Sequence, residues 1–492
     1  MNSFSISPYR KLFYIALLVQ IVTAWFSVGY FHPDEHFQIL EFCNYKLGFS
    51  SPNDLPWEYA AQCRSAIQPL IAFTFSKILL LVGLYNPSTV AFLLRLLIGV
   101  LSWWVCCRLI LLLLPGFKSE KGKRFFVVCS LFLWFVPYLT VRFTAENMSE
   151  LFFLAAILII LSIKNLNSNK RLFYLSIAGL FLGFIPFLRL QMGFSLVALA
   201  IWIVLIKKMH WKDCVILVLS ALVATVISIL IDRWFYGTWV LTPYNYFNQN
   251  IVKNVAAQFG VFPWWFYFTS FIKMAVIPIS IVLLLLFFKG LLEKPFNLFS
   301  LVCIIFLIGH CIIGHKEMRF LFPISFAFIY VASIGMDSWI NKISKTNFYK
   351  WGIRVLFSLN IFLLIFKMFT PSEEIIKYYN FIYAYSQKQS TTIISFEKSP
   401  FFLFPLEVNF YKPGNIKIIV VNKDENIDTV VKKDSIQSFI YLSKTLQLPK
   451  KLSSFNIEKL YCQFPDWVLK YNINHWEDRS YIWTVYKLTP KQ

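Results

Sequence analysis

Long apolar stretches alternate with short polar segments along most of this chain. The first stretch, 12–31, follows two basic residues, and ten more come after it. These further stretches are 88–114, 124–141, 147–163, 172–188, 193–206, 213–231, 265–288, 297–314, 318–336 and 351–369. A helix rises about 1.5 Å per residue, so stretches of about 20 residues can cross a hydrocarbon layer of about 30 Å. The pattern predicts a polytopic α-helical membrane protein with about eleven transmembrane helices.

The first apolar stretch has a competing interpretation as a signal peptide, because Arg10 and Lys11 precede it. No cleavage site of small residues follows the stretch, which ends in the sequence from Phe31 to Glu35. We therefore expect a first transmembrane helix with its basic end in the cytosol.

The run 66–85 is apolar but contains Gln68, Pro69 and Lys77, so it could be a span or a helix lying in the membrane interface. If it does not span, one set of alternate loops carries about twice as many basic residues as the other set. The richer set is Arg10, Lys11, Lys118, Lys121, Lys123, Arg124, Lys164, Lys170, Arg171, Lys207, Lys208, Lys212, Lys289, Lys294, Lys342, Lys345, Lys350 and Arg354. Because basic loops remain in the cytosol, we expect an interface helix, a cytosolic N-terminus and a luminal or periplasmic C-terminus.

The stretch 371–492 differs from the rest because it has no apolar run long enough to span. Pro371–Glu374 resembles a helix start, and four later segments are rich in β-branched and aromatic residues. These segments are 391–396, 416–421, 439–442 and 481–488. The sequence predicts a transmembrane domain over 1–370, with an outer loop at 32–87, and a small soluble α/β domain over 371–492 on the outer face.

Composition narrows the classes of protein that are possible. The net charge of +22 could suggest a nucleic-acid partner, but 58% of the residues are hydrophobic and only 15% are charged. Such a chain cannot form the polar, solvated surface of a soluble nucleic-acid binder, so the expected partner is the lipid bilayer. Of the nine cysteines, Cys43 and Cys63 share the predicted outer loop, where a disulfide or two free thiols are both open. No pair has the spacing of a metal site.

The first polar cluster, His32-Pro33-Asp34-Glu35-His36, directly follows the first apolar stretch. A carboxylate that is partly desolvated at a membrane edge can be tuned to act as a general base. The alternative is a solvated loop at the end of a helix.

The second cluster, from His315 to Arg319, joins two apolar stretches by almost no loop. Lys316 and Arg319 could bind a phosphate, since Arg offers a bidentate fork. The alternative is an ordinary turn whose basic side chains extend to the membrane–water interface.

The third cluster lies in the segment 232–264, where aromatic rings mix with amides such as Asn245 and Asn250. This mixture suits a sugar, whose ring has apolar faces and polar edges, but it is also typical of an aromatic belt at the interface. Arg142 and Arg189 complete the outer edge, where either could pair with an acid or with a lipid phosphate.

The residues of these clusters and their spacing resemble those of glycosyltransferase family 22, the polyprenol-dependent mannosyltransferases. The resemblance rests on His32-Pro33-Asp34-Glu35 with Gln38 and Glu41, Pro56-Trp57-Glu58-Tyr59, Cys63-Arg64-Ser65, Tyr236-Gly237, Thr242-Pro243-Tyr244-Asn245 with Asn250, and His315-Lys316-Glu317 with Arg319-Phe320. The order and spacing agree across residues 32–323. The stretches around Trp57 and Arg64 look most like the glycosylphosphatidylinositol (GPI) mannosyltransferases that add the third or fourth mannose.

The resemblance implies a GT-C fold and an inverting transfer of mannose from a polyprenyl or dolichyl phosphate donor to a lipid-linked glycan acceptor. It implies Asp34 as the general base, with Glu35 assisting, and His315, Lys316 and Arg319 as ligands of the donor phosphate. The substrate-binding residues it implies are His32, Gln38, Trp57, Arg64, Arg142, Arg189, Tyr244, Asn245, Asn250 and Glu317. It implies no cofactor, since the lipid-phosphate sugar is itself a substrate.

Two other functions remain open at this stage. The same fold could transfer another sugar, or act on a bacterial cell-surface acceptor, so either the endoplasmic reticulum or a bacterial inner membrane fits. A membrane transporter is disfavoured, because transporters place ionisable groups near the bilayer midplane and often contain repeated halves. Here the ionisable clusters lie at one membrane edge, and no halves repeat.

Overall fold

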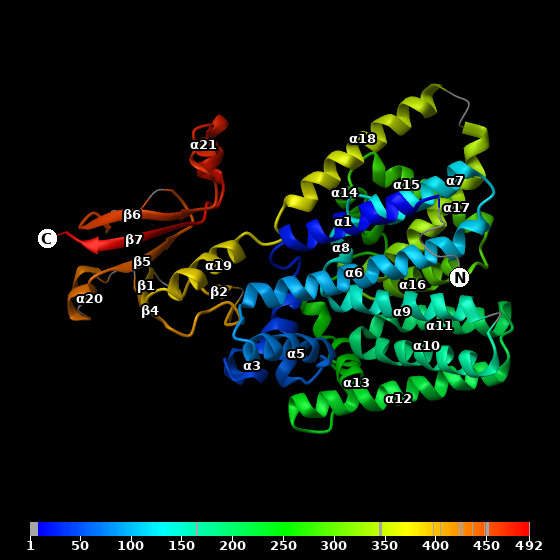
Figure 1. Cartoon of the computed structure of the whole chain (residues 1–492), viewed down its shortest axis with the longest axis horizontal. Coiled ribbons are helices and arrows are strands. Elements are labelled where there is room, and N and C mark those ends of the chain that lie inside the picture. Colours follow the sequence, from blue (N-terminus) through cyan, green and yellow to red (C-terminus); the bar gives the residue numbers. More distant parts are fainter. Residues whose placement is uncertain are drawn as a thin grey trace. The chain divides into compact units, whose positions relative to one another are not determined.

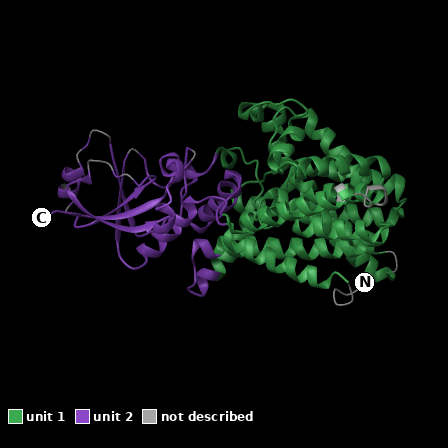
Figure 2. Cartoon of the chain, turned by 90° about the horizontal axis from the view of Figure 1, so that it is seen from above, with its two compact units in different colours: residues 1–27, 57–78, 90–370 green, residues 28–56, 79–89, 371–492 purple. Residues whose placement is uncertain are grey.

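The computed structural model describes residues 8–491, apart from 164–165, 344–346, 397, 404, 423–424, 426, 435, 447 and 449–451. Lys164 and Lys345, two of the basic residues assigned above to cytosolic loops, lie outside the described residues. The chain divides into two compact units, coloured separately in Figure 2. Unit 1 is 1–27, 57–78 and 90–370, and unit 2 is 28–56, 79–89 and 371–492.

Unit 1 is built from helices. They are α1 (Arg10–Phe26), α4 (Trp57–Ala60), most of α5 (Ile67–Leu81) and of α6 (Pro87–Leu113), α7 (Glu120–Phe132), α8 (Val136–Thr140), α9 (Ala145–Ser162), α10 (Ser168–Leu188), α11 (Gly193–Ile201), α12 (Trp211–Tyr236), α13 (Thr242–Phe247), α14 (Phe266–Met274), α15 (Ile279–Glu293), α16 (Leu298–Ile312), α17 (Ser325–Ile343) and α18 (Asn347–Phe369). Figure 1 shows α9, α10 and α12 side by side, and α10 packs against both of the others.

Six helical segments among the described residues are long and apolar enough to cross a membrane. They are Pro87–Gly116, Ala145–Ser162, Ser168–Leu188, Trp211–Tyr236, Met318–Ile340 and Lys350–Phe369. A seventh crossing is possible if α15 and α16, which are bent by 116° at their junction, together form one span. The prediction of a multi-span helical membrane protein is confirmed, and the number of eleven remains a prediction.

Several predicted spans are shorter or broken in the structure. The stretch 265–288 contains α14, a break with a cis bond before Pro278, and only then α15. The stretch 124–141 is divided between α7 and α8, and Pro137 lies in the first turn of α8, where its missing N–H costs nothing. Hydropathy alone does not detect such breaks, because the residues around them remain apolar.

The helix α5 has 15 residues and belongs to the shorter apolar helices. At about 1.5 Å per residue it covers roughly 22 Å, which is less than the hydrocarbon layer. This length agrees with the expectation that the run 66–85 does not span.

Close helix packing in unit 1 depends on small residues. Gly335 of α17 lies against the backbone carbonyl of Leu286 in α15, and Gly290 of α15 lies against that of Val331 in α17. A Cβ atom at either glycine would collide with the carbonyl oxygen of the other helix. Small residues bring helix backbones together in this way in membrane proteins.

Unit 2 combines the segment after the first helix with a small sheet. The first part holds α2 (Pro33–Glu35), a π-helical turn (His36–Glu41) and α3 (Phe42–Leu47). The second part holds α19 (Ile375–Ser386), α20 (Ile427–Lys433), α21 (Asp466–Leu469) and the strands β1 (Thr391–Phe396), β2 (Phe402–Leu403), β3 (Leu406–Glu407), β4 (Ile416–Val421), β5 (Phe439–Ser443), β6 (Phe455–Cys462) and β7 (Thr484–Pro490).

The main sheet has five strands in the order β4-β1-β5-β7-β6. The strand β1 pairs in parallel with β4 and β5, while β7 pairs antiparallel with β5 and β6. The predicted strand segments 391–396 and 416–421 coincide with β1 and β4, and 439–442 and 481–488 overlap β5 and β7. Sequence reasoning missed β6, because this edge strand is largely exposed and its sequence FNIEKLYC mixes polar with apolar residues.

Candidate active site

The first cluster forms a short capped helix in unit 2. Pro33 begins α2, and the backbone N–H of Asp34 donates to Nδ1 of His32 over 3.3 Å. The side chain of Asp34 is 25% exposed, and one of its oxygens lies 3.4 Å from Nδ1 of His32. Glu35 is buried, and its carboxylate accepts a hydrogen bond of 3.0 Å from the backbone N–H of Phe31. The two neighbouring carboxylates therefore differ: Asp34 is accessible, while Glu35 stabilises the turn. Gln38 is buried in the following π turn.

The second cluster lies in unit 1 and is a network of ion pairs. Glu317 accepts from Nε of Arg319 over 2.5 Å and lies 3.1 Å from Nε2 of His315. Glu146, at the start of α9, lies 3.2 Å from Nη1 of Arg189 and 3.6 Å from Nη1 of Arg319. Tertiary structure thus joins three segments that are far apart in the sequence.

The charge balance of this region is positive, because the cationic side chains of Arg189, Lys316 and Arg319 outnumber the carboxylates of Glu146 and Glu317. Lys316 is buried and donates to the backbone carbonyl of Ile313. Arg189 is only 3% exposed, and its guanidinium lies over the ring of Phe320. Its Nε and Nη2 atoms have no hydrogen-bond partner among the described residues. A buried guanidinium with unused donors is suited to an anion such as a phosphate.

The pKa of His315 is raised by its hydrogen bond with Glu317, and burial opposes this shift. Its Nδ1 atom lies 2.9 Å from the backbone carbonyl oxygen of Gly260. Both ring nitrogens therefore face acceptors, an arrangement that favours the doubly protonated, positively charged ring.

Arg142 differs from the other predicted cationic residues in the groups that its side chain contacts. Its guanidinium donates to the backbone carbonyl and to the hydroxyl of Ser27, and it lies over the ring of Tyr138. The side chain is buried. The contacts with Ser27 join the residues after α8 to the end of α1, so this arginine also has a structural role.

The third cluster brings the segments after Trp57 and after Thr242 together within unit 1. The guanidinium of Arg64 lies 5.0 Å from the centre of the Tyr246 ring, and Asn245 donates to the carbonyl of Gln62 over 3.0 Å. Asn250 donates to the carbonyl of Tyr246 over 3.1 Å. Among the predicted substrate-binding residues of this cluster, Arg64 and Asn250 contact Tyr246, while Asn245 contacts Gln62. The aromatic side chains of Trp57 and Tyr244 are exposed.

Sequence reasoning missed two residues that organise this region. Asp232, buried near the end of α12, accepts from the hydroxyls of Ser65 and Thr242 and from the backbone N–H of Ala66, all within 2.8 Å. The hydroxyl of Tyr246 accepts from Gln191 over 2.7 Å. The sequence feature that could have identified Asp232 is an acidic residue directly after the apolar stretch 213–231.

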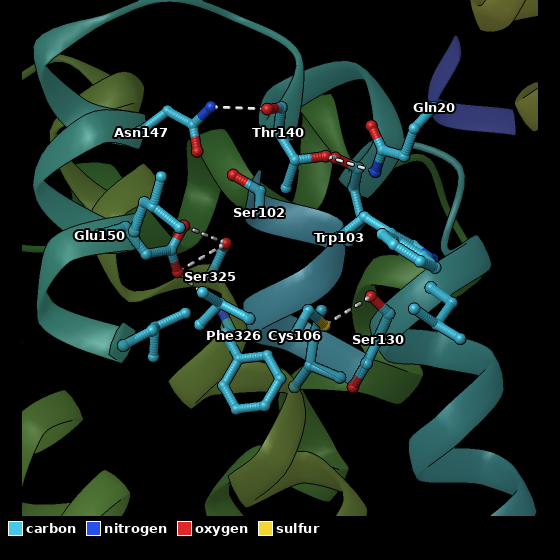
Figure 3. Close-up of a pocket in the computed structure, with 16 residues that line it drawn as sticks. Gln20, Ser102, Trp103, Cys106, Ser130, Thr140, Asn147, Glu150, Ser325 and Phe326 are labelled. Atoms are coloured by element: carbon cyan, nitrogen blue, oxygen red, sulfur yellow. Dashed lines mark hydrogen bonds between the residues drawn. The ribbon is translucent and has the colours of Figure 1, made fainter. Parts of the chain in front are cut away.

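A cavity of about 30 Å³ lies among α1, α6, α7, α8, α9 and α17 of unit 1. Figure 3 shows polar side chains around it, including Gln20, Ser102, Ser130, Asn147 and Glu150. None of the predicted site residues lines it. Its size and polarity suit ordered water. Among the described residues, no group of three or more His, Cys, Asp or Glu side chains could hold a metal ion.

The arrangement of these helices defines a class of membrane protein, that of the GT-C fold. The structure is similar to that of ArnT from Cupriavidus metallidurans bound to undecaprenyl phosphate, with a TM-score of 0.57, 11% identity and 98% of each chain covered. The apo form of ArnT gives a TM-score of 0.50 over 97% of each chain at 12% identity. At these identities the likeness shows the fold alone.

The particular family follows from the sequence. Residues 11–399 match the Alg9-like mannosyltransferase family, and the chain belongs to it. It is 27% identical to GPI alpha-1,2-mannosyltransferase 3 of Bos taurus over 337 residues, which cover 64% of this chain and 56% of the bovine protein. It is also 27% identical to GPI mannosyltransferase 3 of Candida albicans over 344 residues, which cover 66% and 64% of the two chains. The match therefore leaves more than a third of each of these relatives' length uncovered.

Proposed function

We propose that the protein is an inverting glycosyltransferase that moves mannose from a polyprenyl phosphate donor to a lipid-linked glycan acceptor, as in assembly of a GPI-anchor precursor. The family match carries this proposal, because residues 11–399 include both the carboxylate turn at Asp34 and the cationic turn at His315–Arg319. The proposal includes no cofactor, since the lipid-phosphate sugar is itself a substrate, and it leaves the metal requirement to be measured.

The proposed chemistry is an in-line displacement at the anomeric carbon. Asp34 takes the proton of the acceptor hydroxyl, the oxygen attacks, and the polyprenyl phosphate leaves from the opposite face. Asp34 suits this role because its carboxylate is accessible, while Glu35 holds the turn through Phe31.

The leaving phosphate needs positive charge, and His315, Lys316, Arg319 and Arg189 supply it. Arg189 is especially suited, because two of its buried donor atoms have no partner among the described residues. Glu317 holds His315 and Arg319 in place. His32, Gln38, Trp57, Arg64, Arg142, Tyr244, Asn245 and Asn250 are the proposed remaining substrate-binding residues.

The proposal includes the arrangement in the membrane: eleven spans, a catalytic region over 1–370, and residues 371–492 on the luminal or periplasmic face. The N-terminus then lies in the cytosol. The membrane is that of the endoplasmic reticulum in a eukaryote and the inner membrane in a bacterium.

The direct test incubates membranes containing the protein with labelled polyprenyl phosphate mannose and a panel of lipid-linked acceptors. We expect labelled mannose on a GPI-precursor-like acceptor. Transfer only from another polyprenyl phosphate sugar would contradict the donor assignment and favour the second enzymatic function, a transferase of another sugar.

The role of Asp34 is tested with Asp34→Asn, which keeps the size of the side chain but removes the base. We expect a loss of transfer of at least about 100-fold at normal expression, since general base catalysis contributes roughly that much. A matched control is Asp466→Asn, which removes an exposed carboxylate paired with Lys459. Wild-type activity in Asp34→Asn would refute its role as the base.

A further inference from the structure

Two side chains of unit 2 that the proposed mechanism does not use form a fully buried pair. Nε2 of His36 lies 2.8 Å from Oε1 of Glu41, and the two side chains are 0% and 1% exposed. The same oxygen accepts a hydrogen bond of 2.9 Å from the backbone N–H of Phe410. Because a carboxylate oxygen can only accept, His36 is the donor. The carboxylate thus joins the turn after Asp34 to a segment 369 residues further along the chain.

The ring of His36 is fixed on several sides by aromatic residues. It stacks on Tyr411 with ring centres 5.6 Å apart and an angle of 13° between the planes. Phe37 approaches it edge-on at 5.0 Å, and Phe410 does so at 6.4 Å. Phe410 and Tyr411 are themselves buried. The ring therefore has little freedom to move away from Glu41.

This fixed ring is coupled to the orientation of Asp34 through the helical turn. The backbone N–H of His36 donates to the carbonyl of Pro33 and closes α2. Residues two apart in a helical turn do not face each other. Holding His36 inside the core of unit 2 therefore presents Asp34 on another side of the turn, where it is 25% exposed.

A second contact ties the beginning of the same segment to the C-terminal part of unit 2. The carbonyl of Val28 accepts from the backbone N–H of Ser372 over 2.8 Å and from that of Glu373 over 3.2 Å. Gly29 has a φ of +90°, and a Cβ atom there would lie 2.8 Å from the backbone nitrogen of Glu373. The segment carrying Asp34 is thus held at both ends by residues beyond 371.

We propose that His36 and Glu41 are positioning residues, through which the segment 408–411 of the C-terminal region sets the orientation of the catalytic turn. The C-terminal region then contributes to the active site by orienting the turn that carries Asp34. This inference rests on the proposed function, because it takes Asp34 as the group that must be oriented.

The test compares initial rates of Glu41→Ala and Glu41→Gln with wild type at varied donor and acceptor concentrations, normalised to folded protein by size-exclusion chromatography. Misplacement of a catalytic group lowers the turnover and leaves substrate binding unchanged. We expect kcat of Glu41→Ala to fall by roughly 10- to 100-fold with both KM values within about twofold. Glu41→Gln keeps an acceptor for Phe410, so its kcat should fall by a smaller factor of about 3- to 10-fold.

The matched control is Glu407→Gln, which breaks a half-exposed ion pair with Lys412 over 3.2 Å in the same region. Its kcat should remain within about twofold of wild type, because exposed pairs contribute little. Wild-type kcat per folded molecule in Glu41→Gln, with Glu41→Ala either unfolded or equally active, would assign Glu41 to stability alone and overturn the inference. A rise in KM at constant kcat would overturn it as well.

Failure of the proposed function gives a different result from failure of this inference. If Asp34→Asn keeps full activity, the general base is wrong whatever Glu41 does. If Asp34→Asn is inactive and the Glu41 variants keep wild-type kcat, the base stands and the positioning inference fails.

Discussion

His315 shows how one side chain in the candidate site depends on its immediate partners. Its two ring nitrogens face the Gly260 carbonyl and the Glu317 carboxylate, both of which are acceptors. The hydrogen bond with Glu317 raises the pKa of His315 above its usual value of about 6.5. The folded structure therefore favours the positive charge that the proposed mechanism assigns to His315.

This raised pKa predicts a dependence of stability on pH. A histidine whose pKa is higher when folded adds stability that is complete below its unfolded pKa of about 6.5. That stability is lost as the pH rises through the folded value. The difference in melting temperature between wild type and His315→Gln, measured in detergent, should therefore be larger at pH 6 than at pH 9. An equal difference at both pH values would contradict a charged His315.

At the scale of elements, a buried carboxylate satisfies backbone N–H groups that have no partner within their own helix. Glu150 of α9 accepts from the hydroxyl of Ser325 at 3.0 Å and from the backbone N–H of Phe326 at 3.0 Å, at the start of α17 (Figure 3). The first N–H groups of a helix have no partner within it, and a negative charge there is stabilised by the helix dipole. Glu150 therefore fixes α17 against α9.

Removing this acceptor should be costly. Glu150→Ala leaves buried donors without a partner, so we expect a loss of about 1–3 kcal/mol in the free energy of unfolding. Glu150→Gln keeps an acceptor oxygen and should lose less. Thermal unfolding in detergent provides the measurement, with Glu120→Gln, an exposed pair with Lys123, as a control that should change by less than about 0.5 kcal/mol. A small loss in Glu150→Ala would show that the helix start is satisfied without Glu150.

Two glycines allow a matched test of helix packing. Gly335→Ala places a methyl group against the Leu286 carbonyl and should destabilise the protein by about 1–3 kcal/mol. Gly352→Ala, in α18, meets no atom within 4 Å, so it should be neutral or stabilise by up to about 1 kcal/mol through helix propensity. Thermal unfolding of both variants checks the difference, and equal effects would contradict the close contact of α15 with α17.

At the scale of the whole molecule, the distribution of charge predicts how the chain is oriented in the membrane. Most of the net charge of +22 comes from the part before residue 371, in short loops on the predicted cytosolic side. The predicted orientation in the membrane accounts for this positive charge.

This orientation predicts that the two termini lie on opposite sides of the membrane. A glycosylation acceptor site added at the C-terminus should be modified in microsomes, and the same site at the N-terminus should not. Neither Cys43 nor Cys63 takes part in a disulfide in the structure, so the number of reactive thiols should not change on reduction. A C-terminal site that remains unmodified while an N-terminal site is glycosylated would reverse the orientation.

The sequence by itself determined the class of protein, because apolar stretches, basic loops and short motifs are local properties that need no neighbours. It predicted the carboxylate turn at Asp34, the cationic turn at Arg319 and four of the strands. Tertiary structure alone decided which residues meet: that Glu146 joins Arg189 to Arg319, that Arg142 holds Ser27, and that Glu41 reaches Phe410. Such contacts link distant segments, and a buried carboxylate takes whichever donor the fold brings to it. The spacing of residues along the chain does not show which donor a buried carboxylate will bind.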